Sequence, residues 1–128
     1  MKIKLRDVLD LNITLKRIID NNDLNIDSLF KFKLLGIMKN IENEIINYET
    51  IRTENIYKYG KEITDENGNK NFGIPNEDKE SMEKFTKDMN ELVNSDVEVN
   101  IQKLKATDVF DKGLPAEYLV GLYSIIEE

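Results

Sequence analysis

The sequence predicts a mainly helical α+β protein: antiparallel helices with one long central helix, a small sheet and an exposed hairpin. Apolar residues recur every three or four positions over residues 27–60, as on one face of a helix. Polar and apolar residues alternate at the N-terminus and over residues 97–104, as they do in strands. The few predicted strands do not alternate with helices along the chain. A length of 128 residues predicts a single domain, 1–128.

The N-terminal stretch predicts a short strand followed by a helix. Residues 1–5 alternate in polarity, and Asp7 is the expected cap of the helix. The apolar face of this helix consists of Val8, Leu11, Leu15, Ile18 and Ile19. Asn21-Asn22-Asp23 ends it, and the short connection to Asp27 predicts an antiparallel arrangement with the next helix.

The central helix is predicted over residues 27–60. Asp27 and Ser28 are candidates for its cap, and Gly60 is expected to end it in the left-handed conformation. At about 1.5 Å per residue the helix is roughly 50 Å long, more than a domain of this size covers with its own core. We therefore expect a homo-oligomer, with a dimer favoured.

Residues 62–74 predict an exposed hairpin or a mobile loop. Asn67-Gly68 favours a tight two-residue turn, in which both residues adopt positive φ. The same segment resembles the start of a calcium-binding loop. However, Lys70 stands where that loop needs glycine, and Asn76 stands where it needs a bidentate glutamate. We therefore assign no metal site.

The remainder of the chain predicts a helix, a strand and a closing helix. Pro75-Asn76 is expected to start the first of these helices, with Asn76 as its cap, and Asn94-Ser95 to stop it. The strand at about 97–104 is expected to pair with the N-terminal strand. Pro115 stands in the first turn of the closing helix.

The composition excludes most kinds of catalytic chemistry. Cysteine and histidine are absent, which removes thiolate nucleophiles, imidazole bases and the usual transition-metal ligands. We predict that the chain is not an enzyme, with no catalytic residues and no cofactor. A hydrolase that uses paired carboxylates is the remaining enzymatic alternative.

The charge distribution argues against binding to nucleic acid. Residues 62–98 carry 4 basic and 11 acidic side chains, a net charge of −7, and no basic stripe occurs elsewhere. The acidic segment is interpreted as a solvated face, the alternative being mimicry of nucleic acid. No apolar run is long enough to span a membrane and no signal peptide is visible, so a cytoplasmic location is expected.

Four polar residues near the end of the central helix form the candidate contact site. Glu44, Tyr48 and Arg52 follow a spacing of four residues and share one face, with Tyr59 close to the same end. We expect Arg52 to form a buried ion pair with a neighbouring carboxylate. The alternative is that its planar guanidinium binds an anionic ligand.

The run Tyr48–Gly60, followed by Asp65-Glu66-Asn67-Gly68-Asn69, resembles small uncharacterised accessory proteins of phages and prophages of Gram-positive bacteria. In those proteins the end of a helix contains an Arg, followed after a few residues by Tyr-Gly. A turn, a strand of alternating acidic and apolar residues and a short helix come next. The resemblance implies a phage-accessory origin and the cytoplasm of a bacterial host. It implies no catalytic or binding residues.

These observations predict a non-enzymatic binding protein that acts through protein–protein interaction. Its partner would be a phage or host protein, and its role that of an assembly factor or of an inhibitor of a host protein. The alternative is a small-molecule binder that sequesters an anionic nucleotide-like ligand.

Overall fold

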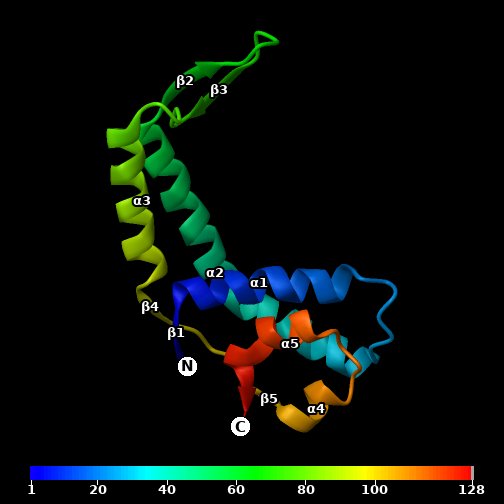
Figure 1. Cartoon of the computed structure of the whole chain (residues 1–128). Helices are drawn as coiled ribbons and strands as arrows, with labels where there is room; N and C mark the ends of the chain where they lie inside the picture. The colour runs from blue at the N-terminus through cyan, green and yellow to red at the C-terminus, as the bar shows by residue number, and fades with distance from the viewer. Residues whose placement is uncertain (128) are drawn as a thin grey trace. The chain divides into compact units, whose positions relative to one another are not determined.

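The computed structural model, which describes residues 1–127, confirms the mainly helical α+β class and the long central helix (Figure 1). The elements are β1 (Lys2–Lys4), α1 (Leu5–Asp20), α2 (Ser28–Tyr59), β2 (Lys61–Thr64), β3 (Lys70–Gly73), α3 (Lys79–Val93), β4 (Asp96–Glu98), β5 (Leu104–Lys105), α4 (Ala106–Phe110), α5 (Ala116–Leu122), the 3-10 turn η1 (Tyr123–Ile125) and β6 (Ile126–Glu127).

The chain divides into two compact units. Unit 1 combines Met1–Ile45 with the chain from Asp96 onward, and unit 2 is Ile46–Ser95. Helix α2 therefore contributes its first part to unit 1 and its second part to unit 2. The expectation of one domain over residues 1–128 stays a prediction.

Unit 1 holds nearly all of the buried apolar side chains. They come from one face of α1, from the first part of α2 and from the segments after Glu98. The largest fully buried ones are Val8, Leu11, Leu15, Ile18, Leu34, Ile41, Val109, Leu122 and Ile125. In α1 and α2 these residues follow the spacing of three and four that predicted the helices.

The strand predicted at about 97–104 is divided into two short strands. Strand β4 pairs antiparallel with β1, as predicted, with Ile3 opposite Val97. Strand β5 instead pairs parallel with the C-terminal β6, with Leu104 opposite Ile126. Ile101 and Leu104 are both buried although they are three residues apart. Side chains three apart in a continuous strand point to opposite faces, so one strand could not bury both on the same face.

Two helices begin at other residues than predicted. Helix α1 begins at Leu5, so Asp7 lies in its first turn rather than at its cap. Leu5 and Val8 are both buried, which favours the earlier start. Helix α3 begins at Lys79 with Asp78, not Asn76, as its cap, because the backbone N–H of Asp78 donates to the Pro75 carbonyl in a turn that precedes the helix.

The predicted cap of α2 is confirmed at Asp27. The backbone N–H of Phe30 donates to Asp27 Oδ1 at 2.8 Å. The other end of α2 differs from the prediction, because Gly60 is not among the residues with positive φ. Glycine is needed there for space: a Cβ at Gly60 would lie 2.4 Å from the Ile56 carbonyl oxygen and 2.6 Å from that of Gly73.

The exposed hairpin is confirmed, with a longer turn than predicted. Strands β2 and β3 pair antiparallel, and Glu62 lies opposite Phe72. Of the two predicted turn residues only Gly68 has positive φ, at +80°. The Gly68 N–H donates to the Asp65 carbonyl, and the Asp65 N–H donates to the Asn69 carbonyl. This is the three-residue loop in which a turn is followed by a left-handed glycine.

Unit 2 consists of the second part of α2, the hairpin and α3, which lies beside α2 in Figure 1. Two side-chain hydrogen bonds join these helices, from Asn55 Nδ2 to Met89 Sδ and from the Tyr59 hydroxyl to Asp88. Pro75 and Met89 are the buried apolar residues of unit 2, and other apolar side chains such as Ile56 and Phe85 are only half-buried. The unit therefore has almost no apolar core of its own.

Candidate functional site

The four residues predicted as a contact site, Glu44, Tyr48, Arg52 and Tyr59, all lie on α2, and their role in contacting a ligand or partner stays a prediction. Glu44 belongs to unit 1, whereas Tyr48, Arg52 and Tyr59 belong to unit 2. Within residues 1–127, no hydrogen bond or ion pair joins any two of the four. The Tyr59 hydroxyl instead donates to Asp88 Oδ2 at 2.5 Å.

Arg52 does not form the expected buried ion pair with a carboxylate. Its side chain is exposed, and it forms no ion pair in the part of the chain that the structure describes. The expected buried pair with a carboxylate is therefore wrong within this chain. The helix period puts Arg52 on one face with Tyr48, but Tyr48 is only half-buried, Arg52 is exposed, and no carboxylate of α3 forms an ion pair with it.

Unit 2 exposes apolar side chains along its part of α2. Ile46, Ile51 and Tyr57 are 53%, 38% and 62% exposed. The Tyr57 ring stacks on Phe72 of the hairpin, with centroids 4.6 Å apart, and Phe72 is itself 42% exposed. Large apolar groups thus reach solvent from both the helix and the hairpin of this unit.

A second apolar surface lies on the first part of α2, within unit 1. Leu29, Phe32 and Leu35 are 65%, 74% and 46% exposed, while Phe30, Leu34, Ile37 and Ile41 of the same helix are buried. Position 32 lies opposite the buried stripe, where an amphipathic helix normally carries polar residues. We call Leu29, Phe32 and Leu35 the Phe32 face.

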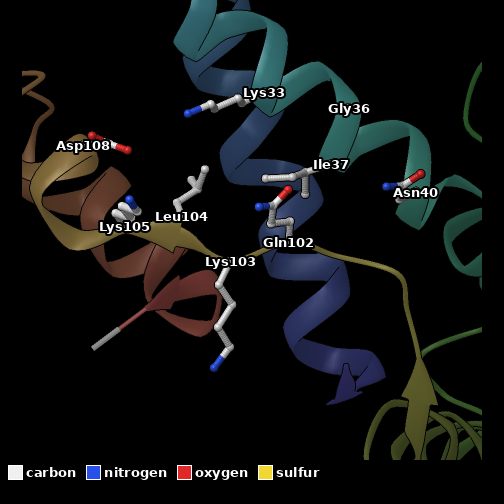
Figure 2. Close-up of a pocket in the computed structure, with 9 residues that line it drawn as sticks. All are labelled: Lys33, Gly36, Ile37, Asn40, Gln102, Lys103, Leu104, Lys105 and Asp108. Carbon is white, nitrogen blue, oxygen red and sulfur yellow. The ribbon is translucent and has the colours of Figure 1, made fainter.

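A hollow of about 420 Å³ lies beside this helix, also within unit 1 (Figure 2). Helix α2 forms one side with Lys33, Gly36, Ile37 and Asn40, and the chain from Gln102 to Lys105 with Asp108 forms the other. We call it the lysine pocket. It brings together two segments, 33–40 and 102–108, that are far apart in the sequence, and no local pattern predicts it.

The lysine pocket has an apolar floor and a polar rim. Ile37 and Leu104 are almost fully buried, and Gly36 leaves open space, since nothing lies within 4 Å of where its Cβ would stand. Asn40 Nδ2 donates to the Asn100 carbonyl at 2.9 Å. This bond links α2 to the chain just before Gln102, where the opposite side of the pocket begins. The rim carries the ammonium groups of Lys33, Lys103 and Lys105 and the carboxylate of Asp108.

The charged groups of the pocket are not neutralised by ion pairs. Within residues 1–127, none of the three lysines nor Asp108 forms a salt bridge. Figure 2 shows Lys33 extending from α2 toward the side where Asp108 and Lys105 lie, while the amino end of Lys103 points away from Lys33. Lys33 and Lys105 are thus the cations available to an occupant.

The two carboxyl groups with shifted pKa values lie at helix caps, not in this pocket. A hydrogen bond from Lys112 and one from the Phe30 N–H lower the pKa of Asp27 below its usual value. Hydrogen bonds from Ser81 likewise lower the pKa of Asp78. In both cases the hydrogen bonds stabilise the charged carboxylate at a helix N-terminus, and the lowered pKa is the result. They are explained by local structure.

Residues 1–127 contain neither a cluster of metal ligands nor a membrane-spanning helix. Over residues 1–127, no three acidic side chains are grouped closely enough to hold a metal ion. No described helix combines the length and the apolarity needed to cross a membrane. Comparison with protein-family models, with curated proteins and with solved structures finds no match.

Proposed function

We propose that this chain is a non-enzymatic binding protein that acts by contacting other proteins. The observation that carries the proposal is the exposure of unit 2, in which Pro75 and Met89 are the buried apolar residues. Two helices and one hairpin bury too little apolar surface for independent stability. A further protein surface would supply the missing burial.

A second copy of the chain is the first partner that we propose for unit 2. Two helix pairs that associate through their apolar sides form a four-helix arrangement, which is a common closed solution for such elements. Ile46 and Ile51 lie on the exposed part of α2 within unit 2 and are suited to this contact. The favoured assembly is a dimer.

The biological setting is proposed from the sequence resemblance. The run Tyr48–Gly60 and the turn at Asp65–Asn69 support an accessory protein of a phage or prophage in a bacterial host. Its role would be that of an assembly factor or an inhibitor of a host protein. Sequestration of a small anionic nucleotide-like ligand is the second candidate, and the lysine pocket is the observation that favours it.

Sedimentation velocity tests the proposed self-association. The wild-type protein is expected to sediment as a dimer at tens of micromolar. The double variant Ile46→Glu/Ile51→Glu should be monomeric, because a dimer would bury two new carboxylates in each copy. Asn22→Glu/Asn25→Glu is the matched control, since both residues are exposed, belong to unit 1 and add the same charge.

Three sedimentation results would each change the proposal in a different way. A wild-type protein that sediments only as a 14.9 kDa species would contradict self-association. Dissociation of both double variants would assign the effect to total charge rather than to the apolar contact. A dimer that persists in the isoleucine variant would move the interface away from this part of α2.

A further inference from the structure

We propose that the lysine pocket binds an extended segment of a partner protein that carries carboxylate side chains beside apolar ones. The inference rests on the proposed function, protein binding, and deepens it by naming the chemistry of the partner. It concerns unit 1 only. Its test is independent of the self-association assigned to unit 2.

The charge of the pocket selects an acidic occupant. Three lysines and one aspartate line it, in a chain whose net charge is −7. Cationic groups that gather around one hollow repel one another, and none of them is paired within the described residues. An incoming carboxylate between Lys33 and Lys105 would relieve that repulsion and form charge-assisted hydrogen bonds.

The floor and size of the pocket add an apolar requirement. Ile37 and Leu104 form an apolar base, and the missing side chain of Gly36 widens the opening. A volume of about 420 Å³ lies at the lower end of the range for ligand sites and accommodates a few amino-acid side chains. On the rim, the amide of Gln102 and the amide oxygen of Asn40, whose Nδ2 is held by the Asn100 carbonyl, can bond to the backbone of an extended segment.

The neighbouring Phe32 face indicates an occupant larger than the pocket. Leu29 and Phe32 lie four positions before Lys33 and Gly36, one helical turn away on the same side of α2, so apolar surface continues from the pocket along the helix. A small anion would fill the hollow and leave Phe32, 74% exposed, in water. A protein segment that enters the pocket brings further residues to cover that face.

Peptide titration followed by ¹⁵N-NMR tests the proposal on the full chain. The probes are acetyl-Leu-Glu-Leu-Glu-amide, the same peptide with Gln in place of Glu, and inorganic phosphate. The Glu peptide is expected to shift the amide signals of Lys33, Ile37 and Gln102–Lys105, and to bind about tenfold more tightly than the Gln peptide. Its affinity should fall as salt is raised.

Charge-reversal variants locate the site. Lys33→Glu/Lys105→Glu should weaken binding of the Glu peptide by about tenfold or more. Lys16→Glu/Arg17→Glu is the matched control, because both cations are exposed on α1 of unit 1 and lie outside the pocket. This control should retain most of the affinity. Circular dichroism verifies that both variants are folded.

Three results would overturn the inference. The first is the absence of shifts at the pocket with either peptide. The second is equal binding of the Glu and Gln peptides, which would remove the role of the lysines. The third is binding of phosphate at the same residues without binding of the Glu peptide, which would make the pocket a small-anion site. None of these results alters the sedimentation test of unit 2.

Discussion

Gly121 of α5 lies directly against Thr14 of α1. A Cβ at Gly121 would stand 1.9 Å from Thr14 Oγ1 and 2.7 Å from Thr14 Cγ2. Thr14 is itself buried, so it has little room to move away. Gly121→Ala is therefore expected to lower the free energy of unfolding by about 1–3 kcal/mol, the usual cost of overpacking. Urea denaturation measures the change.

Gly36 offers the matched control for this substitution. It also lies in a helix, but nothing stands within 4 Å of the position that its Cβ would take. Gly36→Ala should stabilise the protein by about 0.5–1 kcal/mol, because alanine loses less backbone entropy on folding. Equal effects of the two substitutions would show that α5 does not approach α1 this closely.

The second prediction concerns the pH dependence of stability through Asp27. Lys112 Nζ bonds to Asp27 Oδ2 at 2.5 Å, and the Phe30 N–H bonds to Oδ1. Both bonds lower the pKa of this carboxyl group in the folded state. The wild type should therefore be more stable than Asp27→Asn above the ordinary aspartate pKa of about 4. That advantage should shrink as the pH falls through the lowered pKa.

Lys112→Met separates the contribution of the ammonium group. Methionine is similar to lysine in length but lacks the ammonium nitrogen, which lies 5.3 Å from the centre of the Phe30 ring. Without the ammonium group, the pKa of Asp27 should rise toward its usual value, as measured by ¹³C-NMR titration of the carboxyl carbon. An unchanged titration curve would show that Lys112 does not bond to Asp27 in solution.

The third prediction concerns the hydrogen bond between Tyr59 and Asp88, which joins α2 to α3 within unit 2. Tyr59→Phe should lower the free energy of unfolding of this unit by about 1 kcal/mol. Tyr57→Phe is the control, since no hydrogen bond of that hydroxyl occurs in residues 1–127 and the stacking on Phe72 is kept. Hydrogen exchange of the α3 amides reports the local effect. Similar losses in both variants would contradict a specific role of the bond.

The fourth prediction concerns Arg52. Because this side chain is exposed and forms no ion pair within the described residues, Arg52→Ala should change the stability by less than about 0.5 kcal/mol. Thermal unfolding measures it in the monomeric Ile46→Glu/Ile51→Glu background and in the wild type. A loss confined to the wild type would place Arg52 at the proposed interface between copies.

The helices were predictable because their patterns are local. The spacing of Leu11, Leu15 and Ile18 identifies one buried face of α1, and the carboxylate of Asp27 marks the start of α2. Helix starts near Leu5 and Lys79 were misplaced, because several nearby polar residues could serve as caps. The choice among them depended on burial of Leu5 and on the turn at Pro75.

The candidate site was less predictable because its residues are distant in sequence. Lys33 and Lys105 meet at one hollow only after α2 and the 102–105 segment pack together in unit 1. The predicted cluster relied on the helix period alone. That period gives the direction of Glu44, Tyr48 and Arg52 but not what covers them. In unit 2, few residues cover this side of α2: Tyr48 is half-buried and Arg52 is exposed.

Unit 1 is assembled from both ends of the chain, and this affects how the protein is made. The Met1 amino group donates to the Val99 carbonyl at 2.8 Å, and β5 pairs with β6 near the C-terminus. During translation the apolar faces of α1 and α2 emerge well before the residues that cover them. Unit 2, in contrast, is continuous in sequence and has all of its residues available early. In the nascent chain the buried face of α1 therefore lacks part of its cover until α5, which packs against α1 at Thr14 and Gly121, has been synthesised.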